Sequence, residues 1–241
     1  MNPSQRRAWA ALELGPRWSN RPMPSDASAL AVSPAIDARD PVAVPAPAAD
    51  VRLAELRSEV ARCTRCELCQ SRSRTVFGSG PTSARWMIVG DAPGAQEDAS
   101  GEPFVGPSGQ LLTHMLQALG LTRERDVFIT NALKCHPPEN RHPTAQEISR
   151  CLPFLRQQVT QQAPRGLLLM GRFAAQALLG GDEERISALR GRVHECEIDG
   201  VRVPAVVTFH PEYLLRHSAV KALAWADLCL ARDHFGPGSD G

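Results

Sequence analysis

The feature that most constrains the fold is an alternation of short, wholly apolar segments with longer segments of helical periodicity. The apolar segments lie at 86–89, 127–130, 167–170 and 203–209, and segments with helical patterning separate and follow them. Strands that are apolar along their whole length are typical of a parallel sheet whose two faces are both covered by helices. The sequence therefore predicts a three-layer αβα fold of the α/β class, in which the central layer is a four-stranded, mainly parallel sheet.

The expected helices carry recognisable end signals. A helix over 52–61 would place Leu53, Leu56 and Val60 on one face. The helix over 111–119 ends at a glycine, and Thr144-Ala-Gln-Glu147 is a capping box that opens another helix. The last helix is expected at about 219–234.

By composition the chain divides into a tail, a linker, a domain and a second tail. Residues 1–22 are a tail that could form a short helix, and the alanine- and proline-rich residues 23–50 are typical of a disordered linker. Residues 51–236 carry the signals of one domain, and residues 237–241 are a short tail. A frayed first tail is the simpler interpretation, and a peptide that binds a protein partner is the alternative.

Charge and hydropathy exclude several classes of function. The formal net charge of +1 excludes a polybasic nucleic-acid tail, although local basic patches stay open. No run of about 18 apolar residues is present, so no transmembrane helix is expected. No apolar stretch follows the N-terminal arginines, so no secretory signal is expected either. We therefore expect a cytoplasmic protein whose seven cysteines are metal ligands or buried thiols rather than disulfides.

Polar side chains follow the predicted strands at the points where they end. Asp91 follows the first strand, Asn131 the second, Arg172 the third and His210 the fourth. Ligands of parallel sheets bind beyond the carboxyl ends of the strands, so an acid, an amide and an imidazole would converge on one rim. Each alone is more often a cap or turn residue, but the set favours a functional site.

The first of these strand ends carries an acidic turn. The segment 90–98 reads Gly-Asp-Ala-Pro-Gly-Ala-Gln-Glu-Asp, and its small residues let the backbone approach a ligand. It lacks the Gly-Lys-Ser/Thr of a phosphate-binding loop, and its carboxylates would repel a phosphate. The turn suits a bound water or cation, and an acidic solvated loop is the alternative.

Three further features suit a nucleobase. Phe104 lies among turn-forming residues, where it would pack into the core or stack on a planar ligand, and Asn131 offers both a donor and an acceptor to a base edge. The segment His210-Pro-Glu-Tyr-Leu-Leu-Arg216 combines apolar side chains with a cation, which suits a wedge between stacked bases. An ordinary helix start after Pro211 explains that segment equally well.

Four cysteines have a spacing that suits a metal centre. Cys63 and Cys66 form a Cys-x2-Cys pair, and Cys135 and Cys151 lie after the second strand and in the next helix. Four thiolates suit either tetrahedral zinc or an iron–sulfur cluster, but the second Cys-x2-Cys pair of a zinc ribbon is missing. Cys69 extends the first pair toward a ferredoxin-like run that lacks its fourth cysteine.

Taken together, these segments resemble a type-4 uracil-DNA glycosylase, the iron–sulfur branch of the uracil-DNA glycosylase superfamily, over about residues 60–232. Each motif alone is weak evidence for the family, whereas the complete set in this order is highly specific to it. The motifs are Cys63-x2-Cys66, Phe77-Gly78, Gly90-Asp-Ala-Pro-Gly-x2-Glu-Asp98, Pro103-Phe-Val-Gly106, Gly109-Gln-Leu-Leu112, Ile129-Thr-Asn131, Lys134-Cys135, Pro137-Pro138, Asn140-Arg141, Cys151 and His210-Pro-x-Tyr-Leu-Leu-Arg216.

The resemblance implies a monofunctional hydrolase of base excision repair, which releases uracil from DNA and leaves an abasic site. The implied partner is uracil-containing DNA, and a monomer is the default. The implied cofactor is a [4Fe-4S] cluster with the ligands Cys63, Cys66, Cys135 and Cys151, and Cys69 is then a spare. A catalytically silent DNA-binding protein of the same fold, or a glycosylase for another deaminated base, stays open as an alternative.

The resemblance also implies roles for individual residues. The uracil pocket would comprise Gly90, Asp91, Ala92, Phe104, Asn131 and His210. The catalytic residues would be Asp91, Glu97 and His210, and the DNA contacts would come from Leu214, Leu215 and Arg216. The chain departs from the family at Asp91, where glutamate is common. The water-activating aspartate of the best-known relatives falls at Ala92, so Glu97 is the substitute that the type-4 pattern suggests.

Overall fold

The computed structural model describes residues 46–180 and 185–236. The predicted tails at 1–22 and 237–241 and most of the predicted linker lie outside the described residues. The first described helix, α2 (Ala46–Ala61), begins five residues before the expected start of the domain at Val51.

The sheet has five strands in the order β2-β1-β3-β5-β4. The strands β1 (Trp86–Gly90), β2 (Val127–Asn131), β3 (Gly166–Met170) and β5 (Val201–Thr208) are parallel. The prediction of four strands was wrong by one, because β4 (Val193–Ile198) pairs with β5 in antiparallel orientation at the edge. This strand is largely accessible to solvent, so it lacks the continuous apolar run that marks the buried strands.

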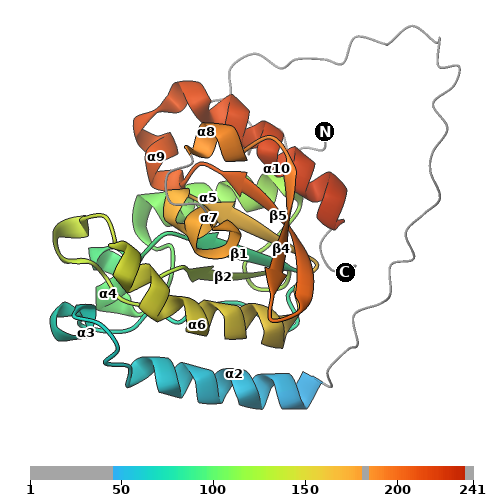
Figure 1. Ribbon diagram of the computed structural model, residues 1–241. Helices are drawn as coiled ribbons and strands as arrows, with labels where there is room; N and C mark the ends of the chain where they lie inside the picture. Colours follow the sequence, from blue (N-terminus) through green and yellow to red (C-terminus); the bar gives the residue numbers. More distant parts are fainter. Residues whose placement is uncertain (1–45, 181–184, 237–241) are drawn as a thin grey trace, which may run out of the picture.

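Helices cover both faces of the sheet, as the sequence predicts (Figure 1). One face is covered by α6 (Ala145–Gln162) and α7 (Arg172–Leu179), with α2 packed outside α6. The other face is covered by α5 (Gly106–Leu119), α9 (Pro211–Arg216) and α10 (Lys221–Phe235). The remaining short helices are α3 (Leu68–Ser71), α4 (Ala95–Ser100), α8 (Ile186–Leu189), η1 (Pro138–Asn140) and η2 (Ser218–Val220).

Local sequence signals set the ends of the helices. The capping box before α6 is confirmed, because the Thr144 hydroxyl accepts a bond from the Glu147 N–H while the Glu147 carboxylate accepts one from the Thr144 N–H. The helix α5 ends at Gly120 in the left-handed conformation that glycine adopts without strain (φ 83°). Leu53, Leu56 and Val60 of α2 are buried, as their spacing predicts.

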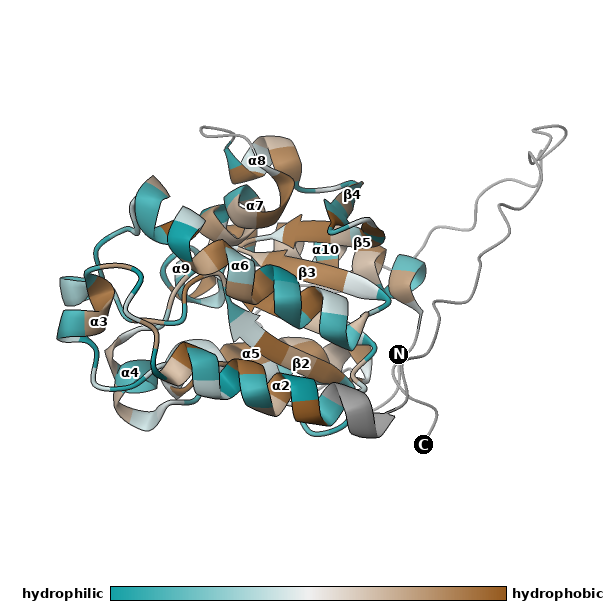
Figure 2. Ribbon diagram, turned by 60° about the horizontal axis from the view of Figure 1, so that its bottom comes forward, coloured by the Kyte–Doolittle hydropathy of each residue, from teal (hydrophilic) through white to brown (hydrophobic). Residues whose placement is uncertain are grey.

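The inner strands such as β3 are the most apolar part of the molecule, whereas the helices combine hydrophobic and hydrophilic residues (Figure 2). Every residue of β1, β2 and β3 is buried, so the sheet is a rigid base for the loops at its ends. The carboxyl ends of β1, β2, β3 and β5 meet at one edge, where the polar residues predicted from the strand ends lie. No helix in the described part of the chain is long and apolar enough to cross a membrane.

Candidate active site

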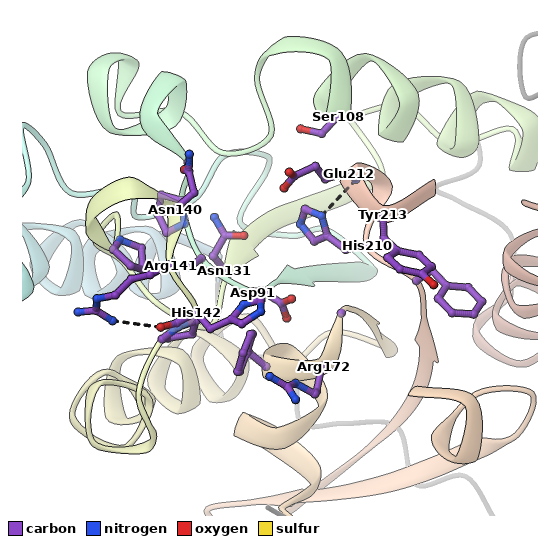
Figure 3. A pocket seen from close by; sticks show the side chains of 18 of the residues that line it. Asp91, Ser108, Asn131, Asn140, Arg141, His142, Arg172, His210, Glu212 and Tyr213 are labelled. Atoms are coloured by element: carbon purple, nitrogen blue, oxygen red, sulfur yellow. Dashed lines mark hydrogen bonds between the residues drawn. The ribbon is translucent and has the colours of Figure 1, made fainter. Parts of the chain in front are cut away.

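A cleft of about 910 Å³ opens at the carboxyl edge of the sheet (Figure 3). Its walls are the segments that follow β1, β2, β3 and β5, the segment before α5 and the loop around η1. The predicted site residues that line it are Asp91, Ala92, Glu97, Phe104, Asn131, His210 and Arg216. Gly90, Leu214 and Leu215 are not among its lining residues.

The Asp91 carboxylate lies between the end of β1 and the start of α7. Its Oδ1 accepts a hydrogen bond from the Ala174 N–H at 2.8 Å. Gly171 makes this approach possible, because a Cβ at that position would collide with the Asp91 carboxylate. Burial raises the pKa of Asp91 to about 7, although the hydrogen bonds from backbone N–H groups and the nearby Arg172 favour the charged form. Asp91 is therefore a carboxyl group that exchanges its proton near neutral pH.

The Glu97 carboxylate shapes the turn on which it lies. One oxygen accepts a hydrogen bond from the Gly94 N–H at 2.7 Å, and the other accepts one from the Val105 N–H at 3.3 Å. The side chain thus joins the start of α4 to the start of α5. Both predicted acids face the cleft, but they are held in different ways.

Phe104 and Asn131 meet at the end of β1, over Gly90. A Cβ on Gly90 would collide with the Asn131 side chain and lie 2.6 Å from the Phe104 ring, so only glycine leaves room for both. Phe104 has a φ of 53°, which is rare for a residue with a side chain. Arg123 holds it there by donating to the Phe104 carbonyl at 3.0 Å and to the Pro103 carbonyl at 2.8 Å.

His210 caps the start of α9 and faces the cleft. Its Nδ1 accepts a hydrogen bond from the Glu212 N–H at 3.3 Å (Figure 3), so the neutral ring carries its proton on Nε2. Burial, and after it the positive charge of Arg216, lower the pKa of His210 to about 4. The imidazole stacks on the Phe104 ring with centroids 5.3 Å apart. At neutral pH His210 is therefore an uncharged hydrogen-bond donor beside an aromatic ring.

The structure separates the two leucines of α9. Leu214, which was predicted to contact DNA, is 1% exposed and packs in the core beneath the helix. Leu215 is 45% exposed, because α9 turns it outward. The Arg216 guanidinium is also exposed and lies 3.4 Å from the Glu212 carboxylate.

Cationic and aromatic side chains that the sequence argument gave no role also border the cleft. Arg141, Arg172 and Arg185 line it, as does Tyr213, which is 39% exposed. Arg141 forms two hydrogen bonds to the Glu147 carboxylate, at 2.6 and 2.9 Å. The sequence offered two signals, the position of Arg172 after the third strand and the motif around Arg141, but only the fold brings these side chains to one cleft.

The predicted cluster ligands gather around one small cavity. Cys63, Cys66, Cys135 and Cys151 line it, and Cys69 does so as well. N–H groups point at the sulfurs: the Lys134 N–H donates to Cys151 Sγ at 3.3 Å and the Arg72 guanidinium donates to Cys135 Sγ at 3.2 Å. Over residues 46–180 and 185–236, no three or more histidine, cysteine or acidic side chains are arranged to hold a single metal ion.

These cysteines come from two segments that are distant in the sequence. Cys63 and Cys66 lie between α2 and α3, Cys135 follows β2, and Cys151 lies in α6. Burial raises the pKa of Cys151 to about 11 and also raises the pKa of Cys66 and Cys135. Four thiols from two segments, with N–H donors aimed at them, have the chemistry that fits an iron–sulfur cluster.

Comparison with known proteins relates this chain to one family. The sequence model of the uracil DNA glycosylase superfamily matches residues 77–229. A type-4 uracil-DNA glycosylase of Pyrobaculum aerophilum is 41% identical over 191 residues, which span 78% of this chain and 95% of that protein. The type-4 uracil-DNA glycosylases of Archaeoglobus fulgidus and Thermotoga maritima are 42% and 40% identical over 166 residues, which span 68% of this chain and 83% and 84% of theirs.

Proposed function

Because the chain belongs to the uracil DNA glycosylase superfamily, we propose that it is a monofunctional hydrolase of DNA repair that releases uracil from DNA and leaves an abasic site. The observation that carries this proposal is the convergence of Asp91, Phe104, Asn131 and His210 on one cleft at the carboxyl edge of the sheet. An acid, an aromatic ring, an amide and a neutral imidazole are what base recognition and glycosidic hydrolysis need in one place. The names of the type-4 relatives support the same substrate.

Uracil selection rests on Asn131. Its amide would donate to O4 and accept from N3–H of a uracil extruded from the strand and stacked on Phe104. Cytosine presents the opposite pattern at these two atoms, so a fixed amide rejects it by roughly 1–3 kcal/mol. The backbone is well fixed, because Asn131 ends a buried strand and the following Ala132 N–H donates to the Gly90 carbonyl at 2.8 Å.

His210 stabilises the leaving group. Negative charge develops on uracil O2 as the glycosidic bond breaks, and the Nε2–H of a neutral His210 would donate to it. Backbone N–H groups at Asp91 and Ala92 would add to this stabilisation. A neutral donor avoids the cost of burying a cation before the anion has formed.

Asp91 positions the attacking water and offsets the positive charge that develops on the sugar. Its pKa of about 7 matches a group that acts near neutral pH. Glu97 supports the site indirectly, because its two oxygens hold N–H groups of the turn at Gly94 and Val105.

The DNA strand is held around the mouth of the cleft. Leu215 would fill the space left by the extruded nucleotide, and Arg216 would bind the backbone beside it. Arg172 and Arg185 add positive charge along the same cleft, which favours phosphates, whereas the charge of Arg141 is paired with Glu147.

A [4Fe-4S] cluster would be held by Cys63, Cys66, Cys135 and Cys151. When bound it supplies a cross-link between the segment before α3 and the segments around β2 and α6, and it carries no step of the reaction. The Lys134 and Arg72 donors would hydrogen-bond its sulfurs.

The test is base release from end-labelled oligonucleotides by protein purified without oxygen. One oligonucleotide carries a single uracil, and matched ones carry thymine, cytosine or hypoxanthine at the same position; alkali then cleaves at abasic sites. We expect strand cleavage only at uracil and only after alkali. A His210→Ala protein, which should release uracil much more slowly, is the control. Cleavage at hypoxanthine would favour the glycosylase for another deaminated base. Binding without cleavage of any of the four would favour the silent DNA-binding protein.

A further inference from the structure

Lys134 is one of two lysines in the chain, and it is buried at the end of β2 with 1% of its surface exposed. Its Nζ donates three short hydrogen bonds, to Thr130 Oγ1 at 2.6 Å, to the Asn131 carbonyl at 2.7 Å and to Gln158 Oε1 at 2.6 Å. All three acceptors are neutral oxygens. The ammonium therefore has acceptors for all three N–H groups, but none of these acceptors carries a negative charge to compensate its own charge.

A buried cation is costly unless an anion lies near it. Among the described residues, no carboxylate pairs with Lys134. The groups that become anions nearby are the thiols of Cys135, its neighbour in the chain, and Cys151, whose Sγ accepts the Lys134 backbone N–H. Cysteines that bind a metal do so as thiolates, so a cluster on these residues places negative charge next to the ammonium.

The same ammonium also holds the main chain of Asn131, the residue proposed to recognise the base. It binds the carbonyl of Asn131, whose amide faces the cleft. The other two acceptors are anchored in turn, because Thr130 Oγ1 and Gln158 Nε2 both donate to the Phe77 carbonyl, at 2.8 and 2.9 Å. The network therefore has little freedom to shift.

Building on the proposed function, we infer that Lys134 is a positioning residue that offsets the charge of the thiolate-bound cluster and holds Asn131 in place for uracil. Cluster retention and uracil selection then depend on one buried ammonium. A lysine that merely fills the core would affect the stability of the fold and neither of these properties.

The experiment compares Lys134→Met with Lys221→Met. Methionine keeps an unbranched side chain, one heavy atom shorter, and removes the charge. Lys221 is the other lysine, also buried (8% exposed), at the start of α10, so its variant controls for the loss of a buried lysine. For each protein, the rate of iron loss to a chelator is followed by visible absorbance, and the affinity for free uracil is measured by calorimetry.

In Lys134→Met we expect iron loss at least tenfold faster than in the wild-type protein and uracil affinity at least tenfold weaker, with both unchanged in Lys221→Met. Unchanged iron loss would overturn the role of Lys134 as counter-charge, and unchanged uracil affinity would overturn its role in holding Asn131. Equal effects in the two variants would overturn both. If the wild-type protein neither binds uracil nor releases it from DNA, the proposed function is refuted. The comparison of iron loss would still test whether Lys134 offsets the charge of the cluster.

A second variant tests the proposal if the Lys134→Met protein does not fold. Gln158→Glu places a carboxylate beside the ammonium, where it forms an ion pair that competes with the thiolates for the charge. We expect a folded protein with at least threefold faster iron loss. Iron retention equal to that of the wild-type protein would overturn the counter-charge.

Discussion

Replacing Asp91 with asparagine should make the protein more stable and less active. Asparagine has the same shape, and its Oδ1 can still accept the hydrogen bond from the Ala174 N–H. The change removes a carboxyl group whose pKa burial raises from 3.8 to about 7. Each pKa unit is worth 1.36 kcal/mol, so the ionised carboxylate costs the folded state about 4 kcal/mol above pH 7. Because the side chain borders an open cleft, solvent reduces this cost and the figure is an upper bound.

The sign follows from the direction of the shift. Between about pH 4 and pH 7 the unfolded chain has lost the proton of Asp91 and the folded protein keeps it, so the free energy of unfolding of the wild-type protein falls as the pH rises. The variant has no such group. Its advantage over the wild-type protein should therefore grow by up to about 2–3 kcal/mol between pH 5 and pH 8.

Urea unfolding of both proteins at several pH values measures this difference, and every other titrating group cancels in the comparison. Glu55→Gln, an exposed change on α2, is the matched control and should show no such growth. An advantage that does not increase with pH would refute the raised pKa. In the same variant the rate of uracil release should fall by about 10²–10⁴-fold, and full activity would refute the role of Asp91 in positioning water.

Four further changes test the rest of the site. His210→Ala should lower kcat by about 10²–10³-fold, and the wild-type rate should show no titration of His210 between pH 5 and pH 8, because its pKa is about 4. Asn131→Asp should weaken the selection of uracil over cytosine by roughly 1–3 kcal/mol in paired oligonucleotide assays, and unchanged selectivity would contradict the base-reading role. Leu215→Ala should slow uracil release from double-stranded DNA more than from single-stranded DNA. Leu214→Ala should instead lower the free energy of unfolding by about 2–5 kcal/mol, since that side chain is buried.

The sheet could be predicted because burial leaves a simple pattern. A strand covered on both faces, such as β1 or β3, is apolar at every position, and its short length separates it from a buried helix. The edge strand β4 could not be recognised in this way, because solvent covers much of it and its polar residues are tolerated. The ends of α5 and α6 were predictable for a different reason: Gly120 and the Thr144–Glu147 pair act through bonds within a few residues.

The site was predictable only in part, because its geometry depends on contacts between distant segments. Strand ends placed Asp91, Asn131 and His210 on one rim, and the structure brings them to one cleft. The sequence does not tell Leu214 from Leu215, since a rotation of α9 by one residue decides which one faces the core. Nor does it reveal that Arg123 holds Phe104, because 19 positions separate the two residues.

Two residues of the cleft and one of the neighbouring cysteine cavity share a physical property that helps to explain why they lie where they do. Asp91 is a partly buried acid, Phe104 has a positive φ, and Lys134 is a buried cation with neutral partners. Each is unfavourable by itself, and each is held by the rigid, fully buried strands beside it. Packing alone gives no reason to keep them, since a simple change such as Asp91→Asn relieves the cost without altering shape. A chain that keeps such residues in and beside one cleft gains something there other than stability, and the proposed release of uracil from DNA would be such a gain.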